Sequence, residues 1–400
     1  MLNSVKVEVF PAAEGDCFLI SSKNSTILID AGVYSTYHDF LKPRLKALSQ
    51  SQGKLDLLVV THIDRDHIEG VIELLKENGN SLNPSIIPID QVWHNSYRHL
   101  QFTKQGHIGI TETEILKSLI TAGKLSRHSN DESKDISAKQ GSTLAALLLS
   151  GGYSWNDSFH GEAINSDLQS NIPFTNFTIR LLSPNSEKLS ALSNTWKREL
   201  KKLKYNFSFT SDALFDDALE FSLLMKGEET TEHNIKSISK RTITFEDLVS
   251  VDDITDRSVT NGSSIAFILN IEGRNLLFLG DSHPDLIADQ LQKITDEQGV
   301  PLHFDLVKIS HHGSSKNTNT RLLDLIICTN YIISTDGTKH GHPDLSTLAK
   351  VINQSSSEKV YIYCNYHTEN ADYFTKSSIK PDCNYSFIFP NTYNNLIIEL

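Results

Sequence analysis

The sequence contains few cysteines, no long apolar run and fewer basic than acidic residues, and each shortage excludes a class of protein. Four cysteines in 400 residues, with no CxxC spacing, exclude a disulfide scaffold and a zinc ribbon. No run approaches the roughly 20 apolar residues that a membrane span needs. The first ten residues alternate like a strand and do not resemble an export signal. We therefore expect a cytoplasmic protein with reduced thiols and no membrane attachment.

The excess of acidic side chains limits the kinds of partner. Thirty-seven Lys and Arg against 49 Asp and Glu give a net charge of −12, so the field of the whole molecule repels polyanions. Binding to nucleic acid would need a local basic patch or bound metal ions. With 38% hydrophobic and 22% charged residues, the composition is otherwise that of a folded globular protein.

Strand and helix patterns alternate near both ends of the chain, which is typical of an α/β fold. In residues 1–95, apolar runs predict strands at 5–9, 17–20, 26–29 and 55–60, and helical spacing predicts helices at 38–48 and 68–75. In residues 258–400 the predicted strands are 264–269, 275–279, 305–309 and 331–334, with a helix at 285–294. We expect one domain, residues 1–400, built from these two halves.

Residues 96–257 have a weaker pattern. Residues 177–182 predict a core strand, but 186–256 are rich in charge and weakly periodic, so we expect an insertion or cap with one or two core strands. A basic run in it comprises Lys197, Arg198, Lys201, Lys202 and Lys204. The run is either the solvated face of an amphipathic helix or a patch that contacts phosphates. Residues 186–256 are also the expected surface for a protein partner.

The strongest chemical signal is a group of histidines and aspartates directly after the apolar run 55–60. The group comprises His62, Asp64, Asp66 and His67. Imidazole and carboxylate ligands together suit zinc, manganese or iron, and the two carboxylates favour the harder ions. The alternative interpretation is an acidic turn that caps a helix.

Polar residues also follow three later strands. Asp281 follows the strand 275–279, His311 and His312 follow 305–309, and His342 comes after 331–334. Because α/β sheets build their sites at the carboxyl ends of strands, we expect these residues to gather with the first group.

Taken in order, these motifs resemble the metallo-β-lactamase fold. They are Asp30-Ala31-Gly32, the HxDxDH group at 62–67, Gly280-Asp281, His311-His312-Gly313-Ser314 and Gly341-His342-Pro343. The set looks most like the hydrolase domain of ComEC-type competence proteins, in a free-standing soluble form. The resemblance implies an αββα sandwich with a large middle insertion.

The resemblance also implies a role for each matching residue. The implied metal ligands are His62, Asp64, Asp66, His67, Asp281, His311 and His312. The first two would bind one divalent cation, the next two a second, and Asp281 would bridge them. Either His311 or His312 would complete the second site, and the other would contact substrate or orient a ligand. Asp30 would support the metal loop without binding metal.

The first metal site lacks one histidine of the resembled pattern. Residues 258–264 stand at the corresponding place and contain Asn261 but no histidine. We therefore expect two divalent cations, Zn²⁺ or Mn²⁺, and a weaker first site that is filled by Mn²⁺ or only when substrate is bound. His283 and His94 are the candidates to replace the missing ligand.

These features together predict a metal-dependent hydrolase in which a metal-bound hydroxide attacks the substrate, most simply a phosphodiesterase or nuclease. The expected catalytic residues are Asp66, His312 and His342, and the expected substrate-binding residues are Asn261, Ser314, Lys316 and His342; Lys308 is a further candidate for holding phosphate oxygens. One alternative is a lactonase or phosphocholine-esterase-like enzyme with a pocket lined by Trp93, Tyr97, Trp155 and Phe159. The other is a degenerate metal-binding subunit of a multiprotein system, for example in defence.

Overall fold

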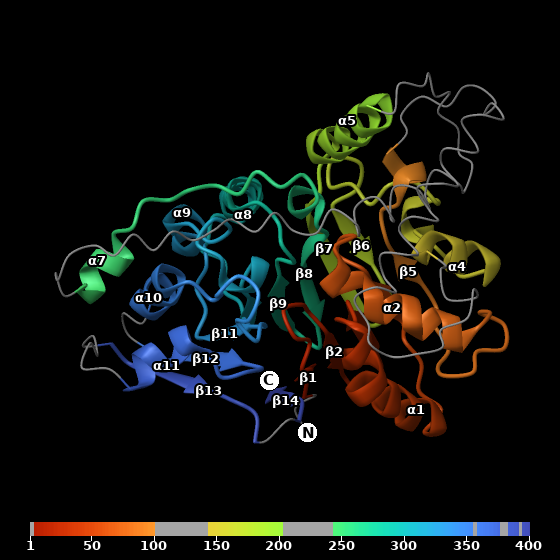
Figure 1. The fold of residues 1–400 in the computed structure, drawn as a ribbon, viewed down its shortest axis with the longest axis horizontal. Coiled ribbons are helices and arrows are strands. Elements are labelled where there is room, and N and C mark those ends of the chain that lie inside the picture. Colours follow the sequence, from red (N-terminus) through yellow and green to blue (C-terminus); the bar gives the residue numbers. More distant parts are fainter. Residues whose placement is uncertain (1–3, 101–142, 203–242, 355–357, 377–382, 392–393) are drawn as a thin grey trace.

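Two mixed β-sheets form the centre of the protein (Figure 1). The structure is a computed structural model, and it describes residues 4–100, 143–202, 243–354, 358–376, 383–391 and 394–400. Within these ranges the first sheet has six strands, in the order β14 (Leu396–Glu399), β1 (Lys6–Val9), β2 (Phe18–Ser21), β3 (Thr26–Ile29), β4 (Leu57–Val59) and β5 (Val92–Trp93). Its strands are antiparallel from β14 to β3 and parallel from β3 to β5.

The second sheet has eight strands in the described part of the chain. Their order is β13 (Tyr385–Ile388), β12 (Val360–Cys364), β11 (Asn330–Ile333), β10 (Leu306–Lys308), β9 (Arg274–Phe278), β8 (Ala266–Ile271), β7 (Phe177–Ser183) and β6 (Asn171–Pro173). Strands β6 to β9 pair antiparallel, and β9 to β13 pair parallel. The strands β6 and β7 come from the middle segment, and β14 pairs with β1, which brings the two ends of the chain together (Figure 1).

Side-chain alternation along the strands sorts the core into separate layers. Leu28 and Leu58 belong to a cluster on the outer face of the first sheet, whereas Ile27 and Leu57 belong to the cluster between the sheets. Successive strand residues point to opposite faces, so an apolar run without polar interruptions is buried on both faces. The continuous runs at β3 and β4 therefore require cover on each side.

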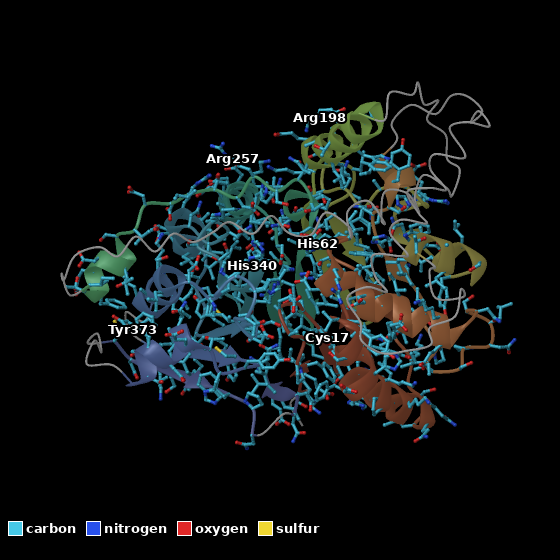
Figure 2. All side chains as sticks on the ribbon, in the orientation of Figure 1. Cys17, His62, Arg198, Arg257, His340 and Tyr373 are labelled. Carbon is cyan, nitrogen blue, oxygen red and sulfur yellow. The ribbon has the colours of Figure 1, made fainter. Side chains whose placement is uncertain are left out.

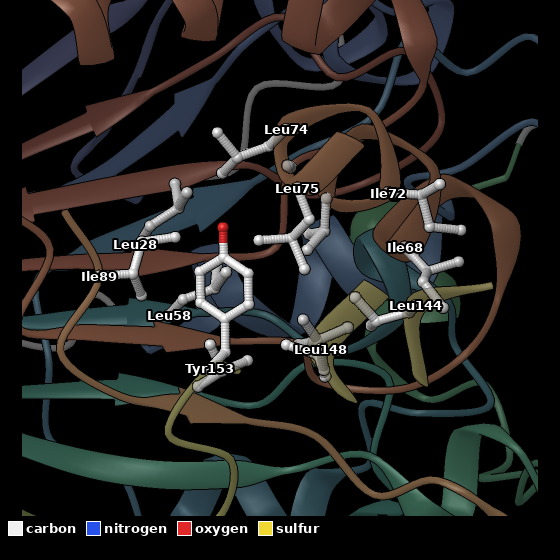
Figure 3. Close-up of a cluster of buried hydrophobic side chains, with 14 of the residues drawn as sticks. Leu28, Leu58, Ile68, Ile72, Leu74, Leu75, Ile89, Leu144, Leu148 and Tyr153 are labelled. Atoms are coloured by element: carbon white, nitrogen blue, oxygen red, sulfur yellow. The ribbon is translucent and has the colours of Figure 1, made fainter. Parts of the chain in front are cut away.

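Helices provide this cover on both outer faces. The outer face of the first sheet packs against α1 (Lys42–Gln50), α2 (Arg65–Asn78) and α4 (Leu144–Ser150). Figure 3 shows Ile68, Ile72 and Leu75 of α2 in this cluster, with Leu144 and Leu148 of α4. The second sheet packs against α8 (Pro284–Gln298), α9 (Thr320–Asp324), α10 (Leu345–Asn353) and α11 (Glu369–Lys376). The order of layers is helix, sheet, sheet, helix, which confirms the expected αββα sandwich.

Some elements differ from the sequence prediction. The helix predicted at 38–48 begins earlier, as a π-helical segment Thr36–Leu41 that leads into α1. Part of the weakly periodic region forms a 17-residue helix, α5 (Ser186–Lys202), and a short helix α7 (Phe245–Val249) lies farther along. The strands β13 and β14 were not predicted. No helix in the described ranges is both long enough and apolar enough to span a bilayer.

Candidate metal centre

The candidate ligands lie at the carboxyl ends of parallel strands. Asp30 follows β3, His62 follows β4, and Asp281 follows β9, while His311 and His312 follow β10. Because β3 pairs parallel with β4 and β9 with β10, these strand ends meet at one edge of each sheet. The residues that follow β4 open helix α2, where Asp66 and His67 lie buried in the first turn.

Four imidazole nitrogens surround a single oxygen of Asp281. Its Oδ2 lies 3.7 Å from His62 Nε2, 3.6 Å from His67 Nε2, 3.7 Å from His311 Nε2 and 3.6 Å from His312 Nε2. Asp281 itself is 2% exposed. Ligand atoms held about 2.0–2.2 Å from a tetrahedral cation are a little over 3 Å apart, so small adjustments would let this arrangement hold metal.

The two histidines of the N-terminal half are anchored through their other ring nitrogen. His67 Nδ1 donates to Asp30 Oδ2 at 2.8 Å. Thr61 Oγ1 donates to the same oxygen at 2.7 Å, and it accepts from His62 Nδ1 at 3.1 Å. With Nδ1 used as a donor in both rings, Nε2 is the nitrogen that remains for a cation.

His311 and His312 are anchored in the same way. His312 Nδ1 donates to the Ser334 carbonyl at 2.8 Å, and His311 Nδ1 donates to Asn317 Oδ1 at 2.9 Å. The orientation of the Asn317 amide is set by its nitrogen, which donates to Asp256 Oδ2 and to the Asp281 carbonyl, both at 3.1 Å. Both Nε2 atoms are thereby directed at Asp281.

Several buried ligand atoms have no hydrogen-bond partner, which is the observation that tests whether a metal fits. They are His62 Nε2, His67 Nε2, His312 Nε2 and Asp66 Oδ1. Buried polar atoms are normally paired, and an orphaned atom needs an explanation such as an ion. Three groupings of ligand atoms in the described part of the chain are close enough to hold one: His62 with His67 and Asp281, Asp66 with His67 and His312, and Asp16 with Asp30 and His67. The residues therefore fit divalent cations.

The structure separates the two histidines that the sequence left equivalent. His312 Nε2 lies 3.5 Å from Asp66 Oδ2 as well as near Asp281, which places it with the second group of ligands. His311 approaches Asp281 and not Asp66, and its ring centroid lies 5.5 Å from that of His342. His311 therefore lies between the candidate ligands and the GHP segment.

Strained backbone supports this segment. His311, His312 and Gly313 have φ values of 45°, 56° and 87°. A non-glycine residue in such a conformation costs about 1–3 kcal/mol and is held only where surrounding structure fixes it. A Cβ on Gly313 would lie 2.5 Å from Pro343 Cβ, so glycine permits the HHGS and GHP segments to pack together.

Asp64 and Asn261 lie at the margin of the cluster. Asp64 Oδ2 is 3.5 Å from His62 Nε2 and accepts a 3.4 Å hydrogen bond from Thr260. Asn261, expected to bind substrate, donates instead to Asp256 Oδ2 at 2.8 Å. It is linked to His311 only through Asp256 and Asn317.

Neither candidate for the missing histidine joins the ligand groups. His283 Nε2 donates to the Ser258 carbonyl at 2.9 Å, and its Nδ1 lies 3.1 Å from Lys188 Nζ, so both ring nitrogens are engaged. His94 is fully buried and stacks on Trp155. Neither is in any close grouping of possible ligands in the described part of the chain.

The remaining predicted substrate-binding residues lie around the GHP segment. His342 is 7% exposed, and its Nδ1 lies 3.3 Å from Asp344 Oδ1. Ser314 is buried and its hydroxyl accepts from the Lys316 backbone at 3.3 Å. Lys316 is half-buried. The backbone of Asp344 donates to the Gly313 carbonyl at 3.0 Å, so this segment is tied to the histidine loop.

Two interpretations of the sequence are wrong at this site. Trp93 and Phe159 pack in the cluster between the sheets, and Tyr97 and Trp155 pack in the outer cluster, so they do not form an aromatic lining around the histidines. Lys308 is 1% exposed and bonded inside the protein, so it cannot contact substrate phosphates.

The basic run of the middle segment is only partly described. Lys204 lies outside the described residues, and Lys201 and Lys202 are placed only as part of α5. Arg198 lies on α5 well apart from His62 and His340 in the view of Figure 2, where the two histidines occupy the middle of the molecule. The described part of the run therefore does not adjoin the histidine cluster.

Sequence reasoning missed Asp16. This aspartate is 1% exposed and its Oδ1 lies 3.5 Å from His312 Nδ1. It also forms a buried ion pair with Lys308. A glycine-aspartate pair between two strands is typical of an ordinary turn, and the long-range packing that buries it is not visible in the sequence.

The charges of the cluster shift the pKa of its members in opposite directions. Burial disfavours the imidazolium of His312, but Asp281 and Asp16 outweigh it and raise the pKa of His312 to about 10. Burial likewise opposes the shift at His67, whose pKa is raised well above its usual range by Asp281, Asp66 and Asp30. Burial would raise the pKa of Asp281, but the surrounding histidines hold it well below the ordinary value. Without metal, therefore, the carboxylates favour the protonated forms of His312 and His67.

These shifts predict opposite pH dependences for metal binding and for the stability of the metal-free protein. A cation must replace the histidine protons, so the affinity for Zn²⁺ should rise with pH by up to about tenfold per unit for each proton released. The raised pKa of His312 stabilises the metal-free fold below about pH 6.5, and that contribution is lost as pH rises toward 10. Calorimetric titration in buffers of different ionisation heat and thermal unfolding between pH 6 and about 9 measure both slopes. A flat affinity with no proton release would contradict this account.

Comparison with known proteins gives the class of the N-terminal segment. The sequence pattern described as "Metallo-beta-lactamase superfamily" matches residues 11–82, which contain β2 to β4, helix α2 and the HxDxDH group. The two mixed sheets are consistent with the metallo-β-lactamase fold. A mutant of the CmlA beta-hydroxylase is a similar solved structure, with a TM-score of 0.38 and 9% identity, covering 100% of this chain and 54% of that one. The chain thus spans about half the length of that protein. No curated protein matches the sequence.

Proposed function

We propose that the protein is a metal-dependent hydrolase that cleaves phosphodiesters, with two divalent cations, Zn²⁺ or Mn²⁺, held around Asp281. One observation carries the proposal: four anchored histidines direct their Nε2 atoms at one Asp281 oxygen that lies 3.6–3.7 Å from each. His62, Asp64 and Asp281 would hold the first cation, and Asp66, His67, His312 and Asp281 the second. The superfamily match over residues 11–82 supports a hydrolase.

The donor set favours phosphorus over carbonyl substrates. Three carboxylates, Asp64, Asp66 and Asp281, accompany the histidines, and oxygen-rich sets suit the harder cations used in phosphoryl chemistry. When bound, a pair of divalent cations polarises the scissile bond, lowers the pKa of water and clamps the attacking and leaving oxygens of an in-line displacement. The cations also offset the net charge of −12 where an anionic substrate must approach.

We propose that His342 acts on the leaving group. Burial lowers its pKa, with Asp344 partly opposing, so the free imidazole is neutral at pH 7. A bound phosphate beside it would favour the imidazolium, and the ring could then give its proton to the departing oxygen. Asp344 fixes the ring by its contact with Nδ1 at 3.3 Å. Lys316 and the Ser314 loop would bind the non-bridging phosphate oxygens.

The placement of α5 favours a small substrate. Arg198 lies apart from His62 in the molecule (Figure 2), so this residue of the basic run does not extend a track for a long polyanion to the cluster. We infer that the substrate is a nucleotide-sized phosphodiester or the end of a strand. Trp93 and Phe159, two of the residues expected to line such a pocket, lie in the core between the sheets, which weighs against the small-molecule esterase alternative.

Hydrolysis by metal-stripped protein tests this function. Bis-p-nitrophenyl phosphate and a labelled oligonucleotide are supplied with Mn²⁺ or Zn²⁺, and we expect either ion to restore cleavage. Asp66→Ala should reduce the restored rate by about 100-fold or more, since it removes a ligand that the second cation needs. The control is Asp289→Asn, an exposed carboxylate paired with Arg321 on the protein surface. Stoichiometric metal binding without cleavage of either substrate would overturn the phosphodiesterase proposal.

A further inference from the structure

A buried ion pair lies directly behind the histidine cluster. Lys308 and Asp16 are each 1% exposed, and Lys308 Nζ pairs with Asp16 Oδ2. The same ammonium donates to the Gly280 carbonyl at 3.1 Å and lies 3.8 Å from Asp281 Oδ1. In the described part of the chain, it is the only lysine or arginine group paired with a carboxylate of the cluster.

Stability alone is a poor explanation for such a pair. Removing two charges from water costs several kcal/mol for each ion, and well-packed apolar residues often replace a buried pair without loss. A fully buried lysine is rare for the same reason. The position of the pair, in contact with both Asp281 and His312, is therefore the feature to explain.

The pair divides the two oxygens of Asp281 between two neighbours. Oδ1 faces the Lys308 ammonium at 3.8 Å, whereas Oδ2 faces the four Nε2 atoms. Rotating the Asp281 carboxylate to offer Oδ1 to a cation would move Oδ1 away from the Lys308 ammonium, which attracts it. Held in this way, the carboxylate can offer cations only one oxygen, Oδ2. Asp16 Oδ1 meanwhile lies 3.5 Å from His312 Nδ1 and reinforces the orientation of that ring.

The loop that carries Asp16 is fixed from both halves of the protein. Ser334 Oγ donates to the Gly15 carbonyl at 2.7 Å, and a Cβ on Gly15 would lie 1.9 Å from the Asp66 carbonyl oxygen. The Asp16 carbonyl also accepts from Gly32 at 2.9 Å. Asp16 is thus held by backbone contacts next to Asp66 from one half and Ser334 from the other.

We propose that Asp16 and Lys308 are positioning residues for the metal centre: the pair holds Asp281 so that it presents a single oxygen to both cations, and it holds His312 toward the second cation. The proposal rests on the metal centre of the proposed function, but not on the identity of the substrate. It assigns a role to two residues that lie outside the ligand set.

The test distinguishes an effect on metal-ligand positioning from an effect on stability. It uses a variant that lacks the ion pair and leaves neither of its charges unpaired. The variant Asp16→Asn/Lys308→Met removes both charges and keeps similar side-chain volumes, so its thermal midpoint should remain near that of the wild type. Its affinity for Zn²⁺, measured by competition with a chromophoric chelator, should fall by about 10- to 100-fold, the usual cost of losing groups that orient metal ligands. The matched control is Asp253→Asn/Lys350→Met, which removes an ion pair outside the cluster between the buried Lys350 of α10 and the exposed Asp253, and which should leave the affinity unchanged.

Each result decides the proposal. Wild-type Zn²⁺ affinity in the folded double variant would overturn it and leave the phosphodiesterase proposal intact, whereas failure of the wild type to bind either Zn²⁺ or Mn²⁺ would overturn both. If the double variant does not fold, Asp16→Asn alone replaces it, because this change substitutes one atom and leaves the loop contacts of Gly15 and Ser334 in place. A folded Asp16→Asn protein should bind Zn²⁺ about 10-fold more weakly, and unchanged binding would overturn the proposal.

Discussion

Replacing Asp281 with asparagine is expected to lower the rate of phosphodiester hydrolysis by about 10³-fold or more. The amide removes the charge on the one oxygen that four histidine nitrogens approach at 3.6–3.7 Å, so both cations lose their shared ligand. Metal content should fall together with the rate. Steady-state kinetics at saturating Mn²⁺ and elemental analysis of the purified variant provide the measurements.

Asp305→Asn is the matched control for this substitution. Asp305 directly precedes the first residue of β10, at the end of the strand away from the histidine cluster. It pairs there with Arg274 at 2.7 Å, so its replacement affects the sheet but not the cluster. The control should retain metal and rate. An Asp281→Asn protein that keeps two equivalents of metal and most of its activity would show that Asp281 does not bridge the cations.

His342→Gln is expected to reduce kcat by about 100-fold for substrates with poor leaving groups, since general acid catalysis is typically worth 10²–10⁴-fold. The p-nitrophenolate ion departs without help, so bis-p-nitrophenyl phosphate should be much less affected than an alkyl or nucleoside phosphodiester. Metal stoichiometry should not change, because His342 is in none of the ligand groupings of the described residues. The measurement is kcat for a series of substrates that differ in leaving-group pKa.

The neighbouring His340 offers the control for this experiment. Its ring centroid lies 5.9 Å from that of His342 in the same segment, and its side chain is half-buried. His340→Gln should leave the leaving-group dependence as in the wild type. An equal loss for all substrates in His342→Gln would contradict the proton-donor role and leave His342 only a binding role.

The sequence predicted the buried strands because these signals are local, whereas the αββα sandwich was implied by the resemblance to the metallo-β-lactamase fold. Uninterrupted apolar runs such as those ending at Val59 and Phe278 require burial on both faces. A polar residue directly after such a run, as with His62 and Asp281, must lie at the sheet edge where the strand ends. The structure brings His62 and Asp281 together, as predicted. Their roles as metal ligands remain predictions, which the experiments above test.

Other features depend on contacts that the sequence does not show. The two candidates His311 and His312 differ only in their partners, Asn317 and Ser334, which later segments supply. Asp16 and Lys308 look like a turn residue and a surface lysine until the fold pairs them across almost 300 residues. The strand β14 forms because β1 is otherwise an unpaired edge. Long-range pairing of this kind leaves no periodic pattern to detect.

Titration of the metal-stripped protein with Zn²⁺ tests the central claim most directly. The account predicts two equivalents bound, with proton release, in the wild type, and loss of both in Asp281→Asn. Binding of no metal by the folded wild-type protein, or wild-type binding by the Asp281→Asn variant, would contradict the claim that the four histidines and Asp281 form a centre for two cations.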